Sequence, residues 1–93
     1  MIALEIGGEP VDITSAELCW IQHWNGDDPA QREWEVRGRT TQTSVREGVR
    51  EIVMTFPDRR LRGRGVVNPS VGPGLTVIEI VGLSTLVEVR DPA

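Results

Sequence analysis

Turn-forming residues recur about every ten positions along this chain, and this spacing limits what the chain can fold into. Between the turns, several segments alternate apolar and polar residues as β-strands do. We therefore predict a mainly β protein with a single domain over 1–93, folded as a small β-sandwich or barrel of about six to seven antiparallel strands. The turns are expected at 7–10, 25–29, 57–60 and 68–74, with a type I′ turn at Asn25–Gly26.

The expected strands lie at 2–6, 16–24, 31–41, 50–56, 61–67, 75–81 and 83–89, and residues 11–14 complete a hairpin with the first of them. The segment before 50–56 is ambiguous. Ser44 and Glu47 match a helix capping box, whereas Gly48 weakens a helix. We predict one short helix near 44–50, of one or two turns, with a continuous helix to Thr55 as the alternative.

The apolar positions of these segments supply the expected core. Its members are Leu18, Trp20, Trp34, Val36, Ile52, Val53, Phe56, Val66, Val77, Ile78, Ile80, Leu83 and Leu86. Burial of one such side chain contributes roughly 1.5–3 kcal/mol. Gly63 and Gly65 lie within a strand, where glycines indicate a bulge or the close approach of another backbone. The charged face of 31–41 should be solvated or matched by a partner.

Length and composition favour an ordinary small globular protein. The chain has 93 residues, of which 39% are hydrophobic and 26% charged. Its apolar runs are too short to span a bilayer, and the acidic start at 1–10 does not resemble a signal peptide. The single cysteine, Cys19, allows no internal disulfide, which favours a cytoplasmic protein. A domain this small buries only about 60–65% of its unfolded surface, so a partner could add to its stability.

Charge is unevenly distributed along the chain. All ten basic residues are arginine, and the net charge is −4. Residues 1–42 carry a net charge of −5, residues 43–68 carry +3, and residues 69–93 carry −2. Alternating acidic and basic segments favour packing between copies of one protein, where one charged face meets another.

No combination of residues matches a catalytic, metal or cofactor site. His23 is the only histidine, and in a strand it would lie about 13 Å from Cys19, too far to act as its base. Asp27 and Asp28 lack the later oxygen ligands of a calcium loop. Gly63 and Gly65 are not followed by the lysine and hydroxyl residue of a phosphate loop. We predict a protein that is not an enzyme and needs no cofactor or metal.

An interaction surface is the better functional hypothesis. Arg60, Arg62 and Arg64 recur at period two, so they share one strand face, and Arg59 precedes them. The acidic flanks and a pI near 4.9 argue against nucleic acid. We expect these arginines to contact carboxylates of another protein subunit, with Trp24 as an exposed anchor beside its turn. The remaining possibility is a solvated strand face.

Several segments resemble the small β structural proteins of tailed bacteriophages. Residues 52–58, 61–67 and 76–82 are similar to the closing strands of tail tube, baseplate and neck proteins, and residues 5–14 are similar to their N-terminal hairpins. The resemblance covers about half of the chain and includes no diagnostic motif. It implies a virion component, assembled in the host cytoplasm, that acts by self-association or docking as a homo-oligomer or as part of a larger assembly, without a membrane.

A second resemblance supplies the alternative function. Arg46 and Arg50, followed by Asn68 and Ser70 before a glycine pair, are similar to the PilZ domain, which binds cyclic-di-GMP. The glycines fall one residue early or one late, and only about 20 residues follow, fewer than that barrel needs. This resemblance implies a small-ligand binding module that uses these four residues.

Overall fold

The structure is a computed structural model that describes residues 1–25 and 28–89, with side chains outside 22–32. It contains eight strands and, in the described ranges, no helix. The strands are β1 (Ala3–Ile6), β2 (Glu9–Val11), β3 (Ile13–Asn25), β4 (Asp28–Thr40), β5 (Gly48–Thr55), β6 (Arg60–Gly72), β7 (Leu75–Gly82) and β8 (Val87–Glu88). The predicted fold class, a mainly β barrel-like domain, is confirmed.

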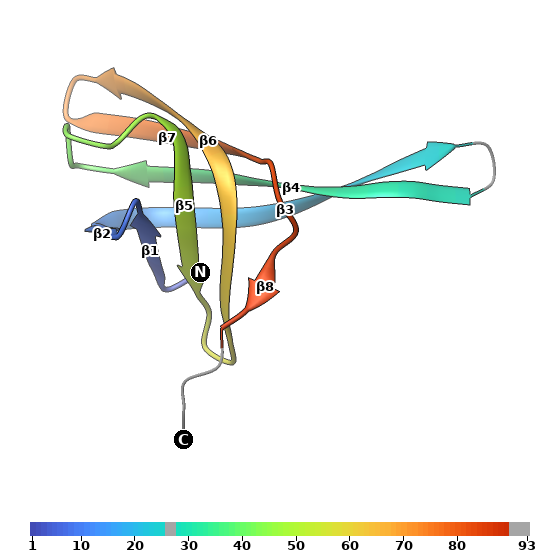
Figure 1. The fold of residues 1–93 in the computed structure, drawn as a ribbon. Helices are drawn as coiled ribbons and strands as arrows, with labels where there is room; N and C mark the ends of the chain where they lie inside the picture. The colour runs from blue at the N-terminus through green and yellow to red at the C-terminus, as the bar shows by residue number, and fades with distance from the viewer. Residues whose placement is uncertain (26–27, 90–93) are drawn as a thin grey trace.

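One antiparallel sheet contains all the strands, in the order β2-β1-β5-β6-β7-β4-β3, with β8 paired to β6 (Figure 1). Its two end strands, β2 and β3, are joined by Asp12 alone, so the sheet must curve back on itself. Two hydrogen bonds hold this junction. The Thr40 hydroxyl donates to the Asp12 carbonyl at 2.5 Å, and the Asp12 amide donates to the Gln42 side chain at 2.6 Å. The result is a half-closed barrel around one core.

The core lies on the inner face of this curved sheet. Buried residues alternate along each strand, as a half-buried sheet requires. They are Leu4, Ile6, Val11, Trp34, Val36, Ile52, Met54, Leu61, Val67, Ile78 and Ile80. Leu18, Phe56 and Leu86 pack against them at the margin.

Several predicted core residues lie elsewhere. Trp20, Val77 and Leu83 are 40%, 37% and 56% exposed, and Val53 and Val66 are only partly buried. Val77 alternates with buried neighbours, so its strand position turns it outward. The prediction also missed six core residues, Leu4, Ile6, Val11, Met54, Leu61 and Val67. Several strands carry apolar residues on both faces, so the sequence alone did not indicate which face points toward the core.

Trp34 fills a recess made by three glycines. A Cβ atom added at Gly82 would lie 2.4 Å from Cε2 of the indole, and Cβ atoms at Gly63 and Gly65 would lie 3.1 and 3.2 Å from its ring. The indole Nε1 donates a hydrogen bond to the Ser84 carbonyl at 2.7 Å. Close packing occurs at both Gly63 and Gly65, but the backbone approach that was predicted is found only at Gly65, where the Val81 carbonyl oxygen would lie 3.0 Å from an added Cβ atom. The other nearest atoms belong to side chains.

The predicted helix near 44–50 is wrong, as is the alternative helix to Thr55. Strand β5 begins at Gly48, which has a φ of 89°. That left-handed conformation interrupts a right-handed helix and favours glycine. Ile52 and Met54 are both fully buried at period two, so tertiary packing selects the strand.

The predicted loop at 68–74 is mostly strand. Strand β6 continues to Gly72, and Pro69 lies opposite Ile78 of β7. Proline is tolerated here because β5 begins only at Gly48, opposite Val67, so beyond Val67 no described strand lies on this side of β6 to receive an amide hydrogen. The prolines and glycines of 68–74 are therefore compatible with a strand whose edge is unpaired on one side.

The predicted strand at 83–89 is reduced to Val87–Glu88. The amides of Leu83 and Ser84 both donate to the Arg64 carbonyl, at 2.8 and 3.3 Å, and the Ser84 hydroxyl accepts the Arg64 amide. The chain therefore bulges away from regular pairing before β8. At the predicted 25–29 turn, Asn25 already pairs with Asp28, and the predicted type I′ conformation lies outside the described residues.

Candidate functional site

A long β-hairpin projects from the barrel (Figure 1). Strands β3 and β4 pair from Ile13 and Thr40 as far as Asn25 and Asp28, whereas β4 pairs with β7 only over Glu35–Thr40. The outer part of the hairpin, here called the arm, comprises residues 21–25 and 28–33. Within the part of the chain that the structure describes, no third strand pairs with the arm.

The predicted interface residues lie in two places. Trp24 lies in the arm, opposite Pro29. Arg60, Arg62 and Arg64 lie on the outer face of β6, because Leu61 and Val67 turn inward. The arginines do share one face, as predicted, but they are on the barrel and not on the arm.

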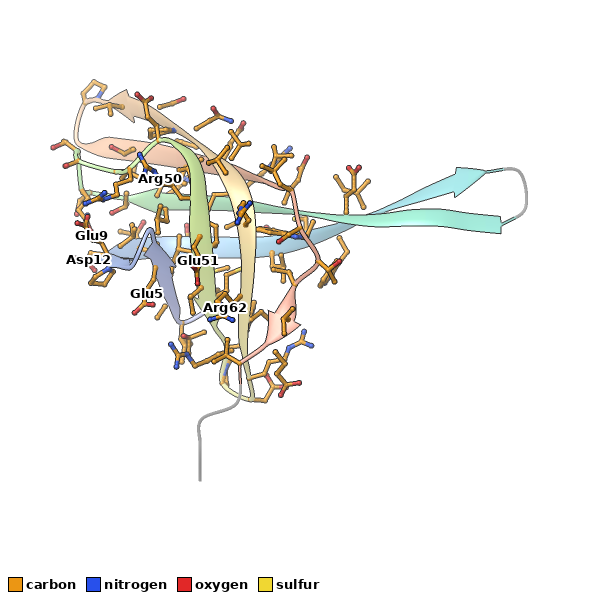
Figure 2. All side chains as sticks on the ribbon, in the orientation of Figure 1. Glu5, Glu9, Asp12, Arg50, Glu51 and Arg62 are labelled. Atoms are coloured by element: carbon orange, nitrogen blue, oxygen red, sulfur yellow. The ribbon has the colours of Figure 1, made fainter. Side chains whose placement is uncertain are left out.

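The arginine face is balanced by acidic neighbours. Arg62 and Glu51 project from adjacent strands (Figure 2), with Nε and Oε1 3.6 Å apart and both side chains more than half exposed. Such exposed pairs contribute little to stability. Arg62 and Arg64 line an open groove of about 690 Å³ with Glu51, Ser84, Thr85 and Val87. Arg59 is placed over the Phe56 ring, 5.7 Å from its centroid.

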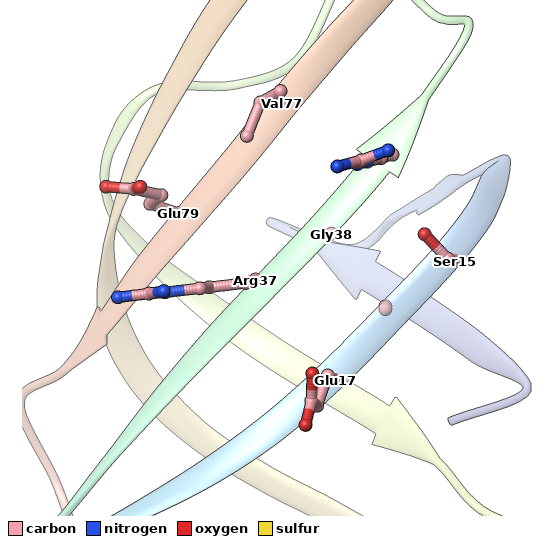
Figure 3. Close-up of a pocket in the computed structure, with 8 residues that line it drawn as sticks. Ser15, Glu17, Arg37, Gly38, Val77 and Glu79 are labelled. Carbon is pink, nitrogen blue, oxygen red and sulfur yellow. The ribbon is translucent and has the colours of Figure 1, made fainter.

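A second open groove, of about 700 Å³, crosses the outer face of β3, β4 and β7 (Figure 3). Arg37 lies between Glu17 and Glu79, which are its cross-strand neighbours on either side. Arg39, Ser15 and Val77 line the same groove. Alternation in 31–41 predicted a charged strand face. The positions of the two flanking glutamates could not be predicted, because they depend on pairing between strands that are far apart in the sequence.

Neither groove has the features of an active site. Both are open, and their charged side chains are exposed to water, whereas catalytic groups usually converge in a partly desolvated cleft. Among the side chains that the structure describes, those of 1–21 and 33–89, no three histidines, cysteines, aspartates or glutamates are grouped to hold a metal ion.

The four residues of the alternative ligand site are not gathered in one place. Arg46 pairs with Glu9 at 2.7 Å across the β1–β2 turn, and Arg50 donates from Nε to the Glu47 carbonyl at 3.0 Å. Along β5, Arg50 occupies a position on the inward-facing side of the strand. Along β6, Asn68 and Ser70 occupy positions on the outer side.

The Glu9–Arg46 pair supports a pH-dependent prediction. The hydrogen bond and charge of Arg46 lower the pKa of the Glu9 carboxyl below its ordinary value. A carboxyl with a lowered folded-state pKa stabilises the fold above its unfolded pKa, and this contribution is lost as pH falls through the folded pKa. NMR titration of Glu9 should show the lowered pKa, and Arg46→Gln should return it towards the ordinary value. An unchanged pKa in the variant would contradict the pairing.

Comparison with family models, with curated proteins and with solved structures finds no match for this chain. The described residues include no helix long and apolar enough to cross a membrane.

Proposed function

We propose that this chain is a non-enzymatic structural subunit that acts by associating with copies of itself within a larger assembly. The observation that carries the proposal is the arm, which extends beyond the barrel and pairs with no third strand among the described residues. An isolated two-stranded hairpin is at best marginally stable in water. A third strand or a packed surface from a neighbouring chain would stabilise it.

The remaining features support the same function. A domain of this size has thin stability of its own, and subunit contacts add to it. Of the side chains that the structure describes, eight large apolar ones are exposed by more than a third, among them Val49, Val71 and Val87. The open grooves carry mixed charges, which favour matching with another protein over binding to nucleic acid.

The resemblance to structural proteins of tailed bacteriophages suggests where such a subunit would work. It would be a component of the tail, neck or outer shell of a virion, assembled in the host cytoplasm. This part of the proposal rests on the sequence similarity of the strands around 52–82 and of the hairpin at 5–14.

Measurement of molar mass across a wide range of protein concentration tests the proposal. We expect the mass to rise from that of one chain to that of a defined oligomer, because association follows mass action. A matched variant in which a short turn replaces 21–33 should stay monomeric while keeping its β-sheet circular dichroism. If the native chain remains monomeric at the highest protein concentration, the proposal is contradicted.

A further inference from the structure

Strand β3 has a long unpaired edge in the described part of the sheet. It pairs with β4 along one side, and no described strand pairs with its other side. The other end of the sheet, β2, has three residues and includes Pro10, and β8 has two residues. Short strands and prolines are ways in which proteins block edge pairing.

Strand β3 lacks the residues that usually protect a sheet edge. Residues 13–25 contain no lysine, arginine or proline, and Glu17 is their only acidic residue. Charged side chains, above all lysine, are the usual barrier to pairing with another chain. The edge of β3 therefore remains competent to add a strand.

The regular part of β3 has a defined centre. Pairing with β4 is in continuous register from Ser15 to His23, and register shifts lie just outside both ends. Cys19 is the middle residue of this stretch. Two identical edges related by a two-fold axis pair antiparallel, and a symmetric pairing of the regular stretch is centred on this residue.

We propose that two copies of this chain join through β3, paired antiparallel with Cys19 opposite Cys19 of the second copy. This inference rests on the proposed function. In this register Glu17 lies opposite Ile21, so the one acidic residue of the edge does not face itself. Leu18, at the margin of the core, lies opposite Trp20, whose side chain is 40% exposed. The pairing thus joins two apolar residues on the core side of the sheet.

The same register explains the arm. With Cys19 at the centre, residues 15–18 of one copy lie beside residues 20–23 of the other. The barrel part of each β3 therefore provides a third strand for the arm part of its partner. A hairpin that is marginal alone becomes part of a three-stranded sheet.

Cross-linking through cysteine tests the register directly. Directly opposite residues have Cβ atoms about 4.5–5.5 Å apart, close to the separation that a disulfide bridges. The native protein, incubated with oxidised glutathione, should form a covalent dimer that is absent in Cys19→Ser. Two further variants in the Cys19→Ser background, Glu17→Cys and Ile21→Cys, supply the register control.

Each control variant alone should form little covalent dimer. Its two cysteines would be four residues apart in the pairing, about 13 Å, beyond the reach of a disulfide. A mixture of the two should cross-link at least about tenfold more, because position 17 faces position 21. Circular dichroism of each variant checks folding, and the native Cys19 result stands without any substitution.

The outcomes separate this inference from the proposed function. A native oligomer that forms no Cys19 cross-link, or variants that cross-link equally well alone, overturns the β3 pairing and leaves self-association intact. A chain that stays monomeric at every concentration overturns both. A native dimer with the Cys19 cross-link, together with selective cross-linking in the mixture, supports both.

Discussion

Replacing Trp34 by alanine is expected to lower the free energy of unfolding by about 3–5 kcal/mol, the usual cost of removing a large buried aromatic side chain. Trp34 is only 2% exposed, and its indole covers Gly63, Gly65 and Gly82. The glycines have no side chains that could fill the cavity, so collapse around it would be limited. The variant also leaves the Ser84 carbonyl without its indole donor.

Urea denaturation followed by far-ultraviolet circular dichroism measures this loss, because the signal does not depend on the tryptophan removed. Trp34→Phe provides a matched control. It retains an aromatic ring over the glycines but lacks the indole N–H, so its loss should be smaller than that of alanine. A loss below about 1 kcal/mol in Trp34→Ala would show that the indole does not hold the sheet together.

Gly82→Ala tests the same contact from the opposite side. Its added methyl group would meet three indole atoms of Trp34 at 2.4–2.6 Å, a separation that forces the ring or the strand to move. We expect a loss of about 1–3 kcal/mol from overpacking. In Gly72→Ala, the nearest atom, the Leu75 carbonyl oxygen, is 3.4 Å away, so the control should change stability by less than about 0.5 kcal/mol. Equal effects in the two variants would contradict the tight contact.

Local sequence signals predicted the strands best where turn and alternation agreed. The alternating strand containing Trp34 and Val36 formed as predicted. A hairpin formed around Gly7, but its second strand is Glu9–Val11 and not 11–14. At 44–50, a capping box and helical spacing competed with strand alternation, and packing of Ile52 and Met54 decided the outcome. The prolines and glycines of 68–74 indicated a loop, although the free edge of β6 accommodates them within a strand.

The candidate site depended on information that is not local. The segments on either side of Asn25 predicted a hairpin, but the arm exists because β4 pairs with β7 only as far as Glu35. That limit follows from the bulge after Gly82, where Leu83 and Ser84 turn to the Arg64 carbonyl. The row of Glu17, Arg37 and Glu79 likewise requires three strands to be aligned. Sequence spacing alone cannot specify such alignment.

Pro69 sets a limit on the size of any assembly built by adding strands. It lies where β6 overhangs β5, and its nitrogen carries no hydrogen with which to bind an incoming chain. Growth of a cross-β fibril requires each molecule to have two unpaired strand edges, so that one chain can pair on either side of it. Because Pro69 blocks this edge, we expect the β3 pairing proposed above to give a closed pair of chains rather than a fibril.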